Sequence, residues 1–116
     1  MRSDSLTQFL GRRFNVVIDR PIGSRHPDFD LVYELNYGYV EGMVAADGEE
    51  QDVYVIGVTE PIERFEGRCI AVIIREDDVE SKLVLAPDGT TFSAEEIVKS
   101  VRFQERFFDS HIVMAT

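Results

Sequence analysis

Short runs of aromatic and β-branched residues, separated by turns rich in Gly, Pro and Asp, occupy the first three quarters of the chain. Such runs are typical of strands. Asp47-Gly48 between two of the runs indicates a hairpin turn. One later run is apolar at nearly every position, as expected of a strand that is buried on both faces. The predicted strands cover residues 14–19, 31–35, 37–45, 52–58, 68–76 and 81–85.

A helix is predicted near the end of the chain. Ser93 and Glu96 have the S-x-x-E spacing in which the two side chains cap a helix start. We expect the helix to run from about Ala94 to Phe108, followed by a last short strand over residues 111–114. The apolar positions at spacings of three, four and seven should form one face that packs on the sheet: Ile97, Val98, Val101 and Phe108.

Six short strands before one late helix predict a mainly β (α+β) fold. The favoured arrangement is a small closed or curled antiparallel barrel with the C-terminal helix outside it. With 116 residues, the chain is long enough for one compact core and too short for two ordinary domains. We therefore expect residues 1–116 to form a single domain.

Composition narrows the class of protein. Apolar residues make up 44% and charged residues 29%, which is a globular balance. No run approaches the roughly 20 apolar residues of a membrane helix, and the first fifteen residues do not resemble a secretory signal. We expect a soluble, cytoplasmic protein without a membrane partner. The single cysteine, Cys69, lies in an apolar run and is expected to be inert core packing.

The net charge of −10 excludes some partners and suggests a cofactor. It repels nucleic acid and anionic membranes, so neither is expected as a partner. The same charge would repel a free polyphosphate, unless bound cations neutralise the site first. A metal requirement is therefore physically reasonable.

The segment from Asp47 to Val53 carries the strongest chemical indication. Its carboxylates crowd one tight turn, and oxygen-only clusters suit hard cations such as Mg²⁺ and Mn²⁺. Tyr37 lies upstream in Asn36-Tyr37-Gly38-Tyr39 and could orient an oxyanion. The combination indicates metal-assisted phosphate chemistry. The alternative is that acids in an Asp-Gly turn only make local hydrogen bonds.

These two motifs resemble the soluble family I inorganic pyrophosphatases, which carry a similar N-Y-G-Y element and a D-G-D-P-x-D-V signature. Asp77, Glu80 and Lys82 fit the family's later series of acid, acid and lysine, and Asp19-Arg20-Pro21 matches its glutamate-x-proline. The resemblance covers about residues 14 to 86. It implies a barrel of the oligonucleotide-binding type and Mg²⁺-dependent hydrolysis of pyrophosphate to two phosphates.

The resemblance also implies roles for individual residues. Asp52, as a ligand shared by two metals, and Glu49, as or beside the general base, would be catalytic. Tyr37 and Lys82 would contact phosphate oxygens. The implied metal carboxylates and their surrounding shell are Asp47, Asp52, Asp77, Asp19 and Glu80.

The chain departs from the family pattern in two ways. Glu49 stands where the family has aspartate, which adds one methylene beside the attacking water. The family's phosphate-binding lysine and arginine between Pro27 and Tyr33, and its late Tyr-Lys pair, have no counterpart. We hypothesise that Arg25 compensates, because its fork geometry suits phosphate. Arg20 and Arg75 are judged less well placed.

Other interpretations remain open from the sequence. Tyr37 could be packing, Lys82 could form a solvated salt bridge on a strand surface, and Asp19 could be a turn cap. Loss of basic residues also suits a non-catalytic or regulatory module that binds metal or a phosphorylated ligand. A third option is an interaction protein in which the acidic residues merely lie in surface turns. The sequence leaves the oligomeric state open, a homo-oligomer included.

Overall fold

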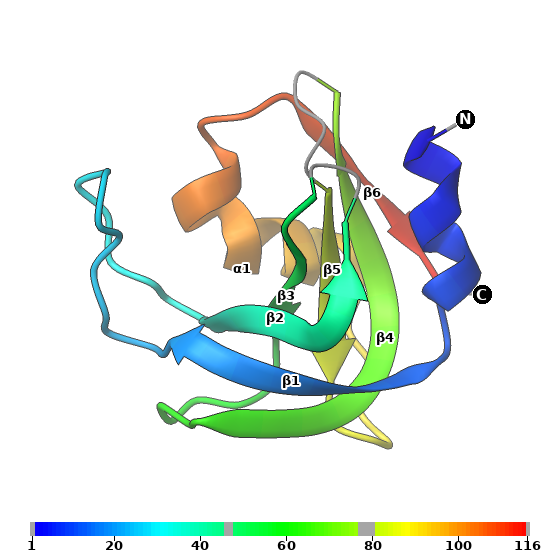
Figure 1. Cartoon of the computed structure of the whole chain (residues 1–116), viewed down its shortest axis with the longest axis horizontal. Coiled ribbons are helices and arrows are strands. Elements are labelled where there is room, and N and C mark those ends of the chain that lie inside the picture. Colours follow the sequence, from blue (N-terminus) through cyan, green and yellow to red (C-terminus); the bar gives the residue numbers. More distant parts are fainter. Residues whose placement is uncertain (1, 46–47, 77–80, 116) are drawn as a thin grey trace.

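The computed structural model describes residues 2–45, 48–76 and 81–115. These residues form a strand-rich fold with one α-helix and an N-terminal 3-10 helix (Figure 1). No helix in these ranges is long and apolar enough to cross a lipid bilayer. In chain order the elements are η1 (Arg2–Phe9), β1 (Arg13–Arg20), β2 (Asn36–Val44), β3 (Glu50–Val55), β4 (Arg64–Arg75), β5 (Ser81–Ala86), α1 (Ala94–Glu105) and β6 (Ser110–Met114).

The strands close into a barrel because β4 is long enough to serve two sides of it. Neighbouring strands follow the order β1-β2-β3-β5-β4-β6, and an additional pairing joins β1 to β4. The first part of β4 pairs with β1, and its second part pairs with β5 and β6. The expected mainly β fold of the oligonucleotide-binding type is confirmed. One pairing within it, β3 with β5, is parallel.

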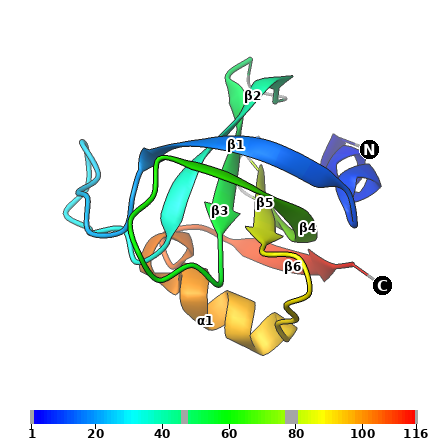
Figure 2. The ribbon, with the colours of Figure 1, turned by 90° about the horizontal axis from the view of Figure 1, so that it is seen from below.

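Side chains on the two faces of the central strands enter two separate cores. Along β3, Val53 and Val55 lie in the inner core of the barrel, whereas Tyr54 lies in an outer core beneath α1. Along β4 the same alternation places Val72 inside and Ile73 outside. The prediction of a strand buried on both faces is thus confirmed for β4. Figure 2 shows α1 lying against the outside of the barrel.

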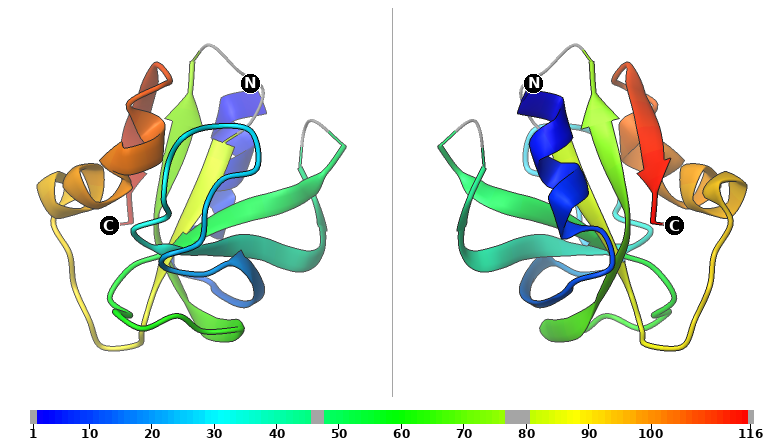
Figure 3. Two further views of the ribbon diagram at one scale, coloured as in Figure 1. Left: turned by 90° about the vertical axis from the view of Figure 1, so that its left-hand side faces the viewer. Right: turned by 90° about the vertical axis from the view of Figure 1, so that its right-hand side faces the viewer.

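Cys69 belongs to the inner core and is fully buried. Loss of hydration raises the pKa of its thiol to about 11, so the reactive thiolate is disfavoured. Leu6 joins the same core, and Figure 3 shows its helix η1 lying against the barrel. The prediction that Cys69 is packing is confirmed.

The predicted capping box starts α1. The Ser93 hydroxyl accepts a hydrogen bond from the Glu96 N–H at 3.1 Å, and the Glu96 carboxylate accepts from the Ser93 N–H at 2.8 Å. The helix ends at Glu105, earlier than predicted. Ile97 is buried, whereas Val98 is 42% exposed, because consecutive helical residues differ by about 100°. Including Val98 in the packed face was wrong.

Residues 31–35, predicted as a strand, belong instead to a long loop between β1 and β2. An isolated bridge joins Arg25 to Val32, and Tyr33 exchanges backbone hydrogen bonds with residues 23 and 24. Both edges of β1 and of β2 are already paired, so no strand edge there is available. Leu31, Tyr33 and Leu35 are buried in the outer core, whereas Val32 between them is exposed, which explains the alternating pattern.

Candidate functional site

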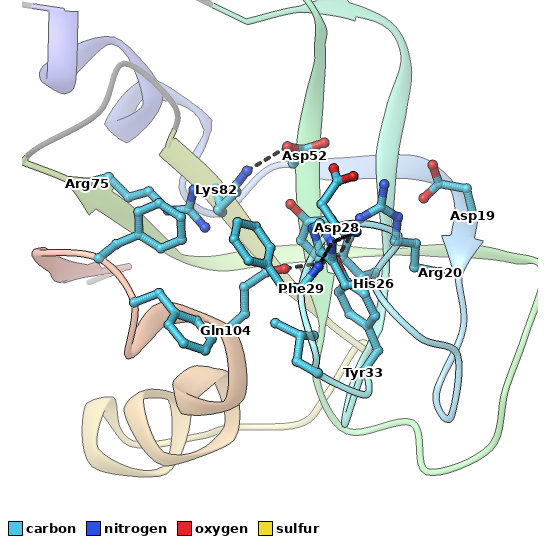
Figure 4. Close-up of a pocket in the computed structure, with 14 residues that line it drawn as sticks. Asp19, Arg20, His26, Asp28, Phe29, Tyr33, Asp52, Arg75, Lys82 and Gln104 are labelled. Carbon is cyan, nitrogen blue, oxygen red and sulfur yellow. Dashed lines mark hydrogen bonds and ion pairs between the residues drawn. The ribbon is translucent and has the colours of Figure 1, made fainter.

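A cavity of about 260 Å³ opens between the outer face of the barrel, the loop of residues 21–35 and the end of α1 (Figure 4). Its charged lining is balanced, with three carboxylates and three basic side chains: Asp19, Asp28, Asp52, Arg20, Arg75 and Lys82. An anion entering such a cavity gains little net attraction until a cation joins it.

The parallel pairing of β3 with β5 brings Asp52 beside Lys82. Val53 lies opposite Leu83 and Tyr54 opposite Val84, so the next residues back along the two strands are neighbours. The Lys82 ammonium Nζ lies 2.6 Å from Asp52 Oδ2. The Lys82 side chain is only 2% exposed, and that of Asp52 is 31% exposed. A solvated salt bridge on a strand surface is therefore excluded for Lys82.

Tyr37 completes this cluster from β2. Its ring is buried and lies 5.7 Å from the Lys82 ammonium. Burial raises the pKa of Tyr37 well above 10.0, and the charge of Asp52 and a hydrogen bond with it add to the shift. The hydroxyl therefore stays protonated.

Asp19 faces the same cavity from the end of β1. Partial loss of hydration raises its pKa, the Arg20 guanidinium opposes that shift, and the Asp52 charge adds to it. Two carboxylates that repel each other across a cavity fit a hard divalent cation, since the donors are oxygens only.

The remaining predicted metal ligands, Asp47, Asp77 and Glu80, lie outside the described residues. In the part of the chain that is described, no group of three or more His, Cys, Asp or Glu side chains could hold a metal ion. Glu49 lies in the turn before β3 with an exposed side chain, and it is not part of the cavity lining. Its role as a base stays a prediction.

The structure places Arg25 away from this cavity. Its guanidinium pairs with Asp30 at 3.2 Å, and the two side chains are 71% and 98% exposed. Arg20 and Arg75 line the cavity in its place, contrary to the sequence-based ranking of the three arginines. The ranking was wrong because the loop turns back at its bridge between Arg25 and Val32, which directs Arg25 to solvent.

A chain of hydrogen bonds connects Arg20 on one side of the cavity to Gln104 on α1. Arg20 donates to the Tyr33 hydroxyl at 2.9 Å, and that hydroxyl donates to Gln104 Oε1 at 2.8 Å. Gln104 Nε2 in turn donates to the Tyr54 hydroxyl at 2.7 Å. Burial raises the pKa of both tyrosines, which keeps their hydroxyls protonated.

The same chain ends at a buried ion pair. The Tyr54 hydroxyl donates to Glu105 Oε2 at 2.6 Å, and Arg75 donates to both Glu105 oxygens at 3.1 and 2.8 Å. Burial disfavours the charged guanidinium, but the hydrogen bonds with Glu105 outweigh it and raise the pKa of Arg75. Phe108 lies 3.6 Å over the guanidinium. The network fixes both arginines at the cavity wall.

Sequence reasoning missed Gln104 and Glu105, although one pattern points to them. Ile97, Val101 and Glu105 are spaced by four, so Glu105 continues the buried stripe of α1. A charged residue at such a position requires a buried partner. Among the described residues, every buried side-chain nitrogen and oxygen has a hydrogen-bond partner.

Known proteins resemble this chain in structure but not in sequence. No protein-family model matches the chain, and no curated protein matches it either. Solved structures do match, among them the inorganic pyrophosphatase of Ehrlichia chaffeensis, with a TM-score of 0.72 and 17% sequence identity. That alignment covers 91% of this chain and 88% of the other. The chain has the fold of the inorganic pyrophosphatases.

Two further pyrophosphatase structures agree. The enzyme from Coxiella burnetii has a TM-score of 0.64 and 19% identity, over 88% of this chain and 83% of that one. The enzyme from Helicobacter pylori has a TM-score of 0.62 and 19% identity, over 88% and 81%. The agreement at such low identity concerns the fold, and the activity must be argued from the cavity.

Proposed function

We propose that the chain hydrolyses a diphosphate bond, as in inorganic pyrophosphate, to release phosphate in the presence of Mg²⁺ or Mn²⁺. The carrying observation is the cluster of Asp52, Lys82 and Tyr37 at the wall of a cavity in a pyrophosphatase fold. Its carboxylate, cation and protonated phenol suit a substrate that is a small phosphate compound.

Asp19 and Asp52 would hold the divalent cation, together with the predicted ligands Asp47, Asp77 and Glu80. Such a cation lowers the pKa of a bound water and neutralises phosphate charge. Asp52 is positioned for this role by the contacts of its carboxylate with the Lys82 ammonium, beside the buried Tyr37 ring. Because these contacts hold the carboxylate in one orientation, little reorganisation would be needed on binding.

Lys82 and Arg20 would bind phosphate oxygens. A guanidinium has five N–H donors, and the contact with Tyr33 accounts for one of those of Arg20. The proposed phosphate contact of Tyr37 would come from its buried position beside Lys82. Arg75 sits deeper, where its pairing with Glu105 limits it to fixing the cavity wall.

The test is phosphate release from pyrophosphate with Mg²⁺ or Mn²⁺. We expect Asp52→Asn, which keeps an oxygen for Lys82, to lower the rate by about 100-fold or more, the order lost when one stabilising group of a transition state is removed. Asp30→Asn is the matched control, because Asp30 is exposed and outside the cavity. Chelation should abolish the activity, and added Mg²⁺ should restore it.

Equal rates for the wild type and Asp52→Asn would refute hydrolysis at this cavity. The alternative, a module that binds without turnover, is favoured by the internal pairing of both Lys82 and Arg75. Calorimetry that detects binding of Mg²⁺ and phosphate without phosphate release would support that alternative.

A further inference from the structure

Two phenyl rings at the cavity are exposed to an unusual degree. Phe29 is 52% exposed and Phe107 is 51% exposed. Among the described residues, five large apolar side chains are exposed: Phe29, Val32, Val44, Val98 and Phe107. The two aromatic ones, Phe29 and Phe107, both line this cavity. Because the rings come from segments far apart in the chain, their meeting at one cavity is a product of the fold.

The two rings lie almost parallel. Their centroids are 6.1 Å apart and their planes differ by 14°. The two rings thus stack on one another, and because each is about half exposed, the pair leaves aromatic surface beside the charged groups of the cavity, a surface that we call the phenyl platform. A platform of this kind favours stacking with another flat ring.

Local contacts hold the phenyl platform in place. His26 Nδ1 accepts the backbone N–H of Asp28 at 3.0 Å and that of Phe29 at 3.3 Å, and its ring lies 4.7 Å from the Phe29 ring. Phe107 follows α1 and donates its backbone N–H to the Gln104 carbonyl at 3.3 Å. His26 and Phe29 from the loop line the same cavity as Lys82 and Asp52 (Figure 4). The platform and the charged groups thus belong to one site.

Inorganic pyrophosphate would leave this platform unused, since it has no apolar surface. We propose that the substrate is a nucleoside diphosphate, whose base stacks on an outer face of the Phe29–Phe107 pair while its phosphates reach Arg20 and Lys82. This inference rests on the proposed function, because it assigns a substrate class to the same cavity. Stacking on aromatic side chains accepts any base, so no preference among bases is implied.

The reaction would be hydrolysis of the terminal phosphate. A water oxygen bonds to the terminal phosphorus, and the bond from that phosphorus to the bridging oxygen breaks. The bridging oxygen keeps the electron pair and leaves as part of the nucleoside monophosphate. The products are a nucleoside monophosphate, inorganic phosphate and one proton.

Binding of uncleavable analogues tests the substrate class apart from turnover. The probes are the α,β-methylene analogue of ADP and methylenediphosphonate, titrated by calorimetry into the full chain with Mg²⁺. We expect the nucleotide analogue to bind at least about fivefold more tightly, the lower end of what one stacked base contributes. Phe29→Ala and Phe107→Ala should each remove that advantage and leave methylenediphosphonate binding within about twofold.

Val32→Ala is the matched control, because Val32 is exposed in the same loop but does not line the cavity. It should change neither affinity, and Phe107→Tyr should retain the nucleotide preference. Equal affinities of the two probes would overturn the inference but leave the proposed function standing. The inference would also be overturned if a phenylalanine variant weakened the binding of both probes equally. The same holds if geranyl diphosphate bound as tightly as the nucleotide analogue. If neither probe binds, the proposed function itself fails.

Discussion

The ion pair between Lys82 and Asp52 predicts an asymmetry between two substitutions. Asp52→Ala would leave the Lys82 ammonium, 2% exposed, without this carboxylate. Lys82→Met would leave the Asp52 carboxylate, which is 31% exposed and borders the cavity, where water can solvate it. Methionine also keeps most of the apolar stem of the lysine. The two changes break the same contact, but they leave behind charges in different environments.

The expected magnitudes follow from this difference in burial. Removing one partner of a buried ion pair costs about 3–5 kcal/mol, and we expect a loss of this size for Asp52→Ala. For Lys82→Met we expect about 1 kcal/mol, the net value of a typical lost hydrogen bond. The double variant should resemble Lys82→Met alone, because no buried ammonium remains. The total stability of a domain is roughly 5–15 kcal/mol, so the larger effect would be readily measured.

Urea unfolding followed by far-UV circular dichroism would measure these values, since the chain contains no tryptophan. The four proteins of the double-mutant cycle should give equal m-values and a coupling of about 3–5 kcal/mol, equal in size to the cost of Asp52→Ala. Asp30→Ala, on the exposed loop, should leave the midpoint unchanged. The reasoning is refuted if Lys82→Met costs as much as Asp52→Ala, or if the double variant costs their sum.

Three further predictions concern single positions. Gly38→Ala should destabilise the fold by about 3 kcal/mol or more in urea unfolding, because its Cβ would lie 1.8 Å from the Val17 carbonyl oxygen; a cost below about 1 kcal/mol would contradict this close strand contact. Cys69, whose thiol pKa is about 11, should resist iodoacetamide at pH 8 and react only after urea is added, as mass spectrometry would show. His26 should titrate below 6.5 by NMR, because loss of hydration and Arg20 lower its pKa. Its contribution to stability is then complete above pH 6.5 and is lost as the pH falls through the lower folded-state value; a midpoint at or above 6.5 would contradict it.

Local patterns predicted most of the strands. The apolar run of β4 and the capping box of α1 depend on residues close in sequence, so the pattern of side chains was sufficient to place them. The prediction of a strand over residues 31–35 was wrong for the opposite reason. Its alternation reflects burial in the outer core, which a loop can achieve as well as a strand.

The candidate site was only partly predictable. The motifs singled out Asp52, Tyr37 and Lys82, which the structure brings together. As a candidate phosphate contact, however, Arg25 was preferred to Arg20 and Arg75, and Arg25 lies outside the cavity. The direction of an arginine in a loop depends on how the loop folds back. Its sequence of turn-forming residues does not determine that path.

The sequence by itself determined most of the strands, the start of α1, the burial of the single cysteine and the acidic motifs. Each of these follows from composition or from spacing over a few residues. Only the tertiary structure decided that Asp52 meets Lys82, because the parallel register of β3 and β5 joins residues thirty positions apart. It likewise decided that Phe29 and Phe107 form one platform. Contacts between distant residues arise from how the strands pair and how α1 packs, and no local pattern specifies either.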